Sequence, residues 1–233
     1  MTLNKSLSKK NLSLLSGLLI GLSYPPGFGI IALFGLVPLL RVWLTSSPIS
    51  SLKYSFLSSI ISCIISLYWI GLNSGASIIP VIISLIAAII YLSIFWPILG
   101  YAISWLKIKY SKTIYIIPFL WVAMEFLKSY GPLAFPWTNL ALTQTRFLSI
   151  LQMIDYTGSE GVSFWVVLVN TIIYLFLYND RHNYREYVII VFFIVTPIFY
   201  GIFKINTLKE KSWEKREISI IQPNIDPNLK WES

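Results

Sequence analysis

Apolar residues occur along most of the chain in long runs, which short polar stretches separate. A helix that crosses a bilayer needs about 20 predominantly apolar residues. The first run is short for a full crossing, and its loss as a span would reverse the side on which the C-terminus lies. The predicted fold class is an all-α polytopic membrane helix bundle. Its seven expected spans are Leu12–Tyr24, Phe28–Leu44, Ser51–Leu72, Ser77–Leu106, Ile114–Tyr130, Gly161–Tyr178 and Tyr187–Phe203.

The fourth run, Ser77–Leu106, is longer than a single crossing needs. It predicts either one tilted helix that is kinked at Pro80 and Pro97, or a helix that projects from the membrane. Two separate crossings would require a polar turn in the middle of the run. Residues Leu85–Ser93 offer no such turn, so we expect one crossing here.

The composition excludes a soluble globular protein. Hydrophobic residues make up 56% of the chain and charged residues 12%, whereas a soluble domain carries about 25% charged residues. The net charge of +8 does not indicate nucleic-acid binding, because the lysines and arginines lie beside the apolar runs. That placement is typical of the cytoplasmic ends of membrane helices.

The distribution of these basic residues predicts the orientation of the bundle. With the N-terminus inside, the inner segments hold ten lysines and arginines, and the short outer loops hold two, Lys128 and Arg146. Basic residues favour the cytoplasmic side. We therefore expect a cytoplasmic N-terminus and, after seven crossings, a C-terminus outside the membrane.

The stretch Trp121–Gln144 departs from the apolar pattern with Glu125, which lies inside an apolar helix. A carboxylate near the centre of a membrane helix costs about 2.5–3.5 kcal/mol on insertion scales, so it needs a partner or a wet cavity. Lys128 follows three residues later and shares a helix face with Glu125. We expect Glu125 to pair with Lys128 or with Arg146. The pair either belongs to a polar site at one membrane face or only fixes helix packing.

The segment after Glu125 predicts a loop at the outer membrane face. Gly131 and the proline after it should end the helix, and Phe135, Pro136 and Trp137 follow. Tryptophan prefers the headgroup level, and Phe135 can reach into the acyl region. A possible membrane-face site therefore consists of Glu125, Phe135 and Trp137.

The connection Gly131–Glu160 is long, and connections of that length are usually functional or contain structure of their own. Within it, Leu148–Tyr156 could form a short interfacial helix.

The remaining candidates for chemistry are few. Cys63 is the single cysteine, so no intramolecular disulfide can form, and its apolar surroundings predict an inert core residue. His182 lies in a polar turn and has no evident partner for metal binding. We expect no metal site and no cofactor.

The last thirty residues change character. Residues 206–217 are charged and predict a linker after a membrane bundle at 1–205, and Ile218–Gln222 predicts a strand that leads into a turn. A single strand cannot fold alone. Residues 218–233 are therefore expected to open a soluble domain that the sequence does not complete.

Four segments carry a family resemblance: LSYPPGFGIIALFGLVPLL, EFLK with GPLAFPWTNL and a following Q, DYTGSEGVSFWVVLVN, and IIQPNIDPNLKW. In these segments, over its whole length, the chain resembles the N-terminal part of bacterial apolipoprotein N-acyltransferase. The resemblance implies a multi-pass protein of the bacterial inner membrane with a nitrilase-like α/β domain on its periplasmic face. Residues 218–233 would then be the start of that carbon-nitrogen hydrolase domain.

The chemistry that the resemblance implies is a two-step acyl transfer. A cysteine thiolate takes an acyl chain from a membrane phospholipid, and the N-terminal lipidated cysteine of a diacylglyceryl lipoprotein then accepts it. The family's catalytic glutamate, lysine and cysteine lie downstream of the K-W match, so no residue of this chain is expected to be catalytic. One substrate-binding position carries over, the tryptophan of that match, Trp231.

Three hypotheses stay open at this point. The chain is a truncated acyltransferase that is inactive by itself, or the membrane half of a split enzyme whose nitrilase-like half is encoded separately, or a non-enzymatic transporter or scaffold. Apart from Glu125 the expected spans are nearly free of charge, which argues against an ion or proton pathway.

Overall fold

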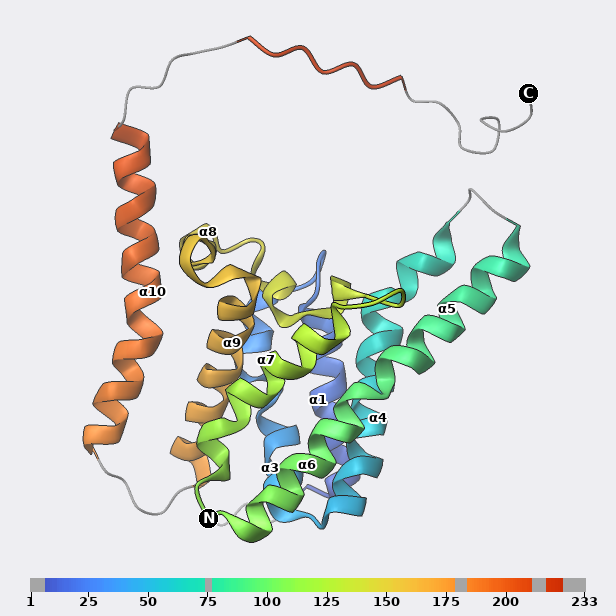
Figure 1. Cartoon of the computed structure of the whole chain (residues 1–233), viewed down its shortest axis with the longest axis vertical. Coiled ribbons are helices and arrows are strands. Elements are labelled where there is room, and N and C mark those ends of the chain that lie inside the picture. The colour runs from blue at the N-terminus through green and yellow to red at the C-terminus, as the bar shows by residue number, and fades with distance from the viewer. Residues whose placement is uncertain (1–6, 74–76, 179–183, 211–216, 224–233) are drawn as a thin grey trace.

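The computed structural model describes residues 7–73, 77–178, 184–210 and 217–223, and its regular structure there is entirely helical (Figure 1). The longer helices are α1 (Lys9–Ser23), α3 (Val37–Thr45), α4 (Pro48–Leu67), α5 (Ile78–Ser93), α6 (Phe95–Lys109), α7 (Ile117–Lys128), α9 (Ile154–Tyr178) and α10 (Tyr184–Glu210). Short helical turns join them: η1 (Gly29–Ile31), α2 (Ala32–Gly35), η2 (Tyr68–Leu72), η3 (Thr113–Ile116), η4 (Pro136–Thr138), η5 (Leu140–Gln144) and α8 (Leu148–Leu151). The predicted helix bundle is confirmed.

Four helical stretches within the described residues are long and apolar enough to cross a membrane: Pro48–Leu72, Ile78–Lys109, Ile154–Tyr178 and Val191–Leu208. The remaining three expected spans are also mainly helical, but their helices are shorter, and Gly29–Thr45 is a shorter apolar helix. The chain thus has several apolar helices typical of a membrane protein, while the number of seven crossings stays a prediction.

The helix of the fourth run is interrupted near one of the two expected prolines, but the backbone at the interruption stays α-helical (Ile94 φ −74°, ψ −28°), so a kink stays a prediction. The helix breaks between Ser93 and Phe95, at Ile94. The ring of a proline inside a helix clashes with the carbonyl four residues earlier, and the residue four before Pro97 is Ser93. Pro80 causes no kink because α5 begins at Ile78, and a first-turn residue needs no backbone N–H donor.

Three further boundaries differ in detail from the sequence prediction. The sixth span begins earlier than Gly161, since α9 starts at Ile154 and contains a non-helical residue at Gly158 (φ 66°). The expected interfacial helix is divided between α8 and the start of α9. Helix α10 continues to Glu210, so the first residues of the expected linker are helical.

The strand expected at Ile218–Gln222 is not confirmed. Residues 217–223 form neither helix nor strand, and Ile218, Ile220 and Ile221 are at least 82% exposed. A strand requires backbone hydrogen bonds to a neighbour, and the described part of the chain supplies no neighbouring strand.

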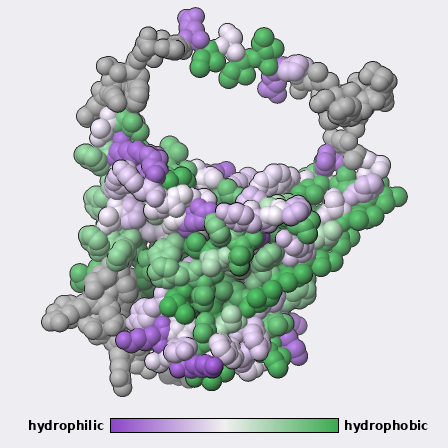
Figure 2. Space-filling model, in the orientation of Figure 1, coloured by the Kyte–Doolittle hydropathy of each residue, from purple (hydrophilic) through white to green (hydrophobic). Residues whose placement is uncertain are grey.

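The two ends of the bundle differ in chemistry. At the end of the bundle where α1 begins in Figure 1, Lys9 Nζ donates to the carbonyl of Thr45 at 3.3 Å and Lys107 Nζ donates to that of Leu44. We call this the basic end. The opposite end, which we call the loop end, holds the connection between α7 and α9 and the C-terminal end of α10. Figure 2 shows a broad hydrophobic band between hydrophilic residues at the two ends.

Helices α1 and α4 pack closely against each other, and small residues make this approach possible. A Cβ added at Gly17 would lie 2.5 Å from the backbone oxygen of Ser58, and one at Gly21 would lie 2.8 Å from Cβ of Ile65. Both distances are shorter than van der Waals contact, so the two helices can lie this close only with glycine at these positions.

We therefore expect Gly17→Ala to push α1 away from α4 and to lower the free energy of unfolding by about 1–3 kcal/mol, as overpacking does. Chemical unfolding in detergent micelles, followed by circular dichroism, measures this change. Leu18→Ala is the control, because Leu18 is 45% exposed on the same helix. Equal stability of the two variants would contradict the proposed close contact.

Candidate membrane-face site

The connection between α7 and α9 folds back over the end of α7. Gly131 has φ 86°, a left-handed conformation that glycine adopts without strain. The N–H of Ala134 then donates to the carbonyl of Gly131 at 3.1 Å, and that of Phe135 donates to the carbonyl of Lys128 at 3.2 Å. Helix α7 ends at Lys128, as the glycine and proline at 131–132 predict.

Glu125, a residue of α7, holds this connection through a hydrogen bond. Its side chain is 1% exposed. Its Oε1 accepts hydrogen bonds from the indole Nε1 of Trp121 and from the backbone N of Leu140, both at 2.8 Å. One carboxylate oxygen therefore binds a residue one turn earlier in its own helix and the first residue of η5.

The expected ion pair of Glu125 is not formed. Among the described residues, neither Lys128 nor Arg146 lies within 4.0 Å of its carboxylate. Both N–H donors bind Oε1, and the buried Oε2 has no hydrogen-bond partner among the described residues. Lys128, nearly one turn later, donates to Thr138 instead.

Lys128 fixes the other part of the connection. It is 3% exposed, and its Nζ donates to Oγ1 of Thr138 at 2.8 Å. The hydroxyl of Tyr24, at the end of α1, donates to the backbone carbonyl of Thr138 at 2.6 Å. Thr138 is thus held by two helices, and the ammonium of Lys128 also lies at the C-terminal end of α7, where the helix dipole favours a positive charge.

Phe135 lies immediately before η4, and Trp137 lies within it. Phe135 is half-buried and packs against the cluster that contains Leu67 and Leu92, whereas Trp137 is 56% exposed. Their ring centroids are 5.4 Å apart, and the ring of Trp69 lies 5.2 Å from that of Trp137. Phe135 and Trp137 therefore lie together on the connection, with Trp69 of η2 beside Trp137. Glu125 lies on α7 and contacts this connection at Leu140, not at the two aromatic residues.

An apolar pocket of about 440 Å³ lies beside Phe135, between α5 and the connection. Its lining residues are Ala87, Ala88, Tyr91, Pro132, Leu133, Ala134 and Phe135. A pocket with this lining suits a hydrocarbon chain and offers no charged group to an ion.

Two buried amide side chains were missed in the sequence prediction. Gln144 is fully buried, and its Nε2 donates to the carbonyl of Gly29 at 3.0 Å. Asn170 accepts from the N of Leu36 at 2.8 Å and donates to the carbonyl of Ala32 at 2.7 Å. An amide inside an apolar run is the signal that could have identified Asn170, since a buried polar side chain requires partners.

The other predicted residues add no reactive group to this site. Cys63 is 6% exposed and packs with Leu67 and Leu92. No group of three or more histidine, cysteine or acidic residues that could hold a metal ion occurs in the described ranges. Trp231 and His182 lie outside the described residues.

The contacts of Glu125 lead to a stability prediction. We expect Glu125→Leu to lower the free energy of unfolding by about 1–3 kcal/mol, because the buried N–H groups of Trp121 and Leu140 lose their acceptor. Glu125→Gln keeps an oxygen at that position, so we expect a smaller loss. Thermal unfolding in detergent measures both. Equal losses in the two variants would show that the shared acceptor does not hold the connection.

The family model and the relatives that match this chain carry the same name. The family model described as "Apolipoprotein N-acyltransferase N-terminal domain" matches residues 16–172. A protein of Geobacter metallireducens named apolipoprotein N-acyltransferase is 27% identical over 232 residues, which cover 95% of this chain and 44% of that protein. A Chlorobaculum tepidum protein of the same name is 28% identical over 233 residues, which cover 95% of this chain and 42% of that protein.

A third protein of that name, from Pasteurella multocida, is 23% identical over 236 residues, which cover 95% of this chain and 44% of that protein. The chain spans less than half the length of these three curated relatives. Since the family model matches well over half of the chain, the chain belongs to the family of the apolipoprotein N-acyltransferase N-terminal domain.

Proposed function

We propose that this chain is the membrane part of an apolipoprotein N-acyltransferase of the bacterial inner membrane. Such an enzyme transfers an acyl chain from a phospholipid to the N-terminal lipidated cysteine of a lipoprotein. The observation that carries the proposal is the family match over residues 16–172. The substrates are then a membrane phospholipid as donor and diacylglyceryl lipoproteins as acceptors. A separately encoded nitrilase-like half is a possible partner.

The pocket beside Phe135 supports a role in handling the acyl donor. It is apolar, it lies at the loop end, and one of its walls is α5, which belongs to a helical stretch capable of crossing the membrane. A phospholipid could pass an acyl chain from the bilayer into this pocket while its headgroup stays at the loop end. Trp137, with Trp69 beside it, would lie at headgroup level.

The buried contacts of Glu125 and Lys128 support a role in positioning. They hold the connection in one conformation before any substrate binds, and a preformed surface avoids the cost of ordering a loop on binding. We assign no catalytic role to a residue in the described part of the chain. Trp231 remains a proposed substrate-binding residue on the basis of the family resemblance, and Cys63 is too deeply buried to serve as the nucleophile.

We further propose seven crossings, with the basic end in the cytoplasm and the loop end in the periplasm. In Figure 1, α1, α4, α7 and α10 run toward the loop end, and α3, α5 with α6, and α9 return. The cluster of Lys9, Arg41 and Lys107 near the basic end supports the orientation through the preference of basic residues for the cytoplasm.

Fusions of a periplasm-dependent reporter test this topology. We expect alkaline phosphatase to be active when it is fused after Ser233 and inactive when it is fused after Lys112, because the first point is predicted to be periplasmic and the second cytoplasmic. Green fluorescent protein at the same two points should give the opposite pattern. A fluorescent fusion after Ser233 would contradict an odd number of crossings.

A chimera tests the function. We expect a protein in which this chain replaces the matching N-terminal part of the Geobacter metallireducens relative to acylate a diacylglyceryl peptide in phospholipid vesicles, measured by mass spectrometry. In this chimera Trp137→Ala should lower turnover about tenfold, since misplacing a substrate costs rate steeply, with little loss of folded protein.

Trp105→Ala is the matched control, because Trp105 is similarly exposed, at 43%, but lies on α6 near the basic end. A folded chimera without activity would contradict the proposed function. Unchanged turnover in Trp137→Ala would show that the connection only packs against the bundle.

A further inference from the structure

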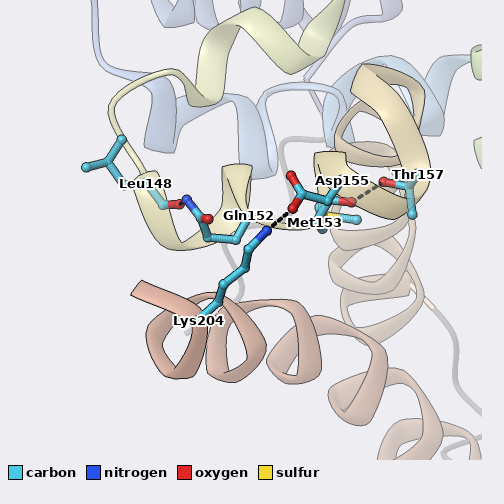
Figure 3. Close-up of polar contacts among 6 residues, drawn as sticks. All are labelled: Leu148, Gln152, Met153, Asp155, Thr157 and Lys204. Atoms are coloured by element: carbon cyan, nitrogen blue, oxygen red, sulfur yellow. Dashed lines mark hydrogen bonds and ion pairs between the residues drawn. The ribbon is translucent and has the colours of Figure 1, made fainter. Parts of the chain in front are cut away.

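Helix α10 meets the rest of the bundle near its C-terminal end. Figure 3 shows Lys204 reaching from α10 to Asp155, with which it forms an ion pair. One turn earlier, the ring of Tyr200 lies 5.8 Å from that of Tyr156 in a T-shaped arrangement. Both partners of α10 come from the first turn of α9.

The backbone of α10 also comes very close to α8 at Gly201. A Cβ added to Gly201 would lie 1.7 Å from the backbone oxygen of Ser149 and 2.5 Å from its carbonyl carbon. No side chain fits into that space, and a backbone carbonyl has little freedom to move aside. Glycine at position 201 is therefore required for this approach.

The segment that receives α10, residues 148–158, is held by its own hydrogen bonds. Gln152 Nε2 donates to the carbonyl of Leu148 at 3.0 Å, and Thr157 Oγ1 donates to that of Met153 at 2.9 Å (Figure 3). The left-handed residue Gly158 then redirects the chain into the long part of α9. This segment, which we call the elbow, includes the start of the DYTGSEG motif.

Elsewhere α10 is loosely packed. Only 6% of the residues in its apolar stretch Val191–Leu208 are buried, compared with 56% in the corresponding stretch of α9. Trp165 Nε1 donates to the carbonyl of Ile194 at a long 3.3 Å. A cavity of about 230 Å³, whose lining includes Phe147, Trp165 and Ile198, lies between α10 and the bundle.

We propose that the elbow and the Gly201–Lys204 turn of α10 form a clamp that fixes α10 on the bundle. The clamp thereby sets where the chain leaves α10 at the loop end. An exposed ion pair contributes little to stability, and Asp155 is 59% exposed. The ion pair therefore selects the register of α10, while the close approach at Gly201 brings the two backbones together. This exit point would matter for catalysis if a soluble domain follows α10, as the family resemblance implies. That consequence therefore rests on the proposed function.

The distance between α10 and α7 tests the clamp without any assay of acyl transfer. The background variant is Cys63→Ser, which removes the single cysteine. Spin labels are attached to Leu127→Cys on α7 and Phe203→Cys on α10, both of which are 71% exposed. Double electron–electron resonance in lipid nanodiscs should give one narrow distance distribution.

We expect Gly201→Val to shift and broaden this distribution, because α10 must move away from Ser149. Thr196→Val is the matched control: its side chain bonds only to Phe192 in the same helix, on a different face from Gly201. The same narrow distribution in Gly201→Val as in the background would overturn the proposal.

A second part of the experiment tests the ion pair with substitutions at Asp155 and Lys204. Asp155→Asn should broaden the distribution, and the exchange Asp155→Lys with Lys204→Asp should narrow it again. Ser159→Ala, just beyond the elbow, is the control and should leave the distance unchanged, because the hydroxyl of Ser159 donates to the adjacent Glu160. Failure of the exchange to restore a narrow distribution would overturn the register role. Either failure leaves the proposed acyl transfer untouched, since the chimera tests that independently.

Discussion

The shared carboxylate oxygen of Glu125 is the interaction on which the loop end of this molecule depends. It accepts one N–H from within α7 and one from the start of η5, both at 2.8 Å and both buried. These two bonds offset part of the cost of burying a carboxyl group in a membrane bundle, since Oε2 is buried without a hydrogen-bond partner among the described residues. The result is a connection that is fixed to α7 near its midpoint, at Leu140.

The sequence predicted the parts of the fold that depend on local composition. Apolar runs gave the helices, the glycine and proline at 131–132 gave the end of α7, and the isolated Glu125 marked the connection as special. It predicted the wrong partner for Glu125, because opposite charges three residues apart are an obvious pair, whereas a backbone N–H fifteen residues away leaves no mark in a sequence. Trp69 was missed for the same reason, since its contact with Trp137 joins η2 and η4, which are far apart in the sequence.

Two other differences have equally physical causes. Pro80 was expected to kink a helix, but a kink requires a preceding turn, and α5 begins only two residues earlier. Ile218–Gln222 has the composition of a strand, but a strand exists only through its neighbour. Local propensity thus predicted the type of an element well where its backbone hydrogen bonds are internal, as in a membrane helix. It predicted the type poorly where those bonds need a segment that is distant in the sequence.

Two parts of the loop end, the connection between α7 and α9 and helix α10, are attached to the bundle by different interactions. The connection is held by buried polar bonds to Glu125 and Lys128, where a lost partner leaves an unsatisfied group in an apolar medium and is therefore expensive. Helix α10 is held by a glycine-permitted backbone contact and an exposed ion pair, both of which are weaker. The connection beside the apolar pocket is therefore fixed by buried polar bonds, whereas the position of α10 depends on the few contacts of the clamp.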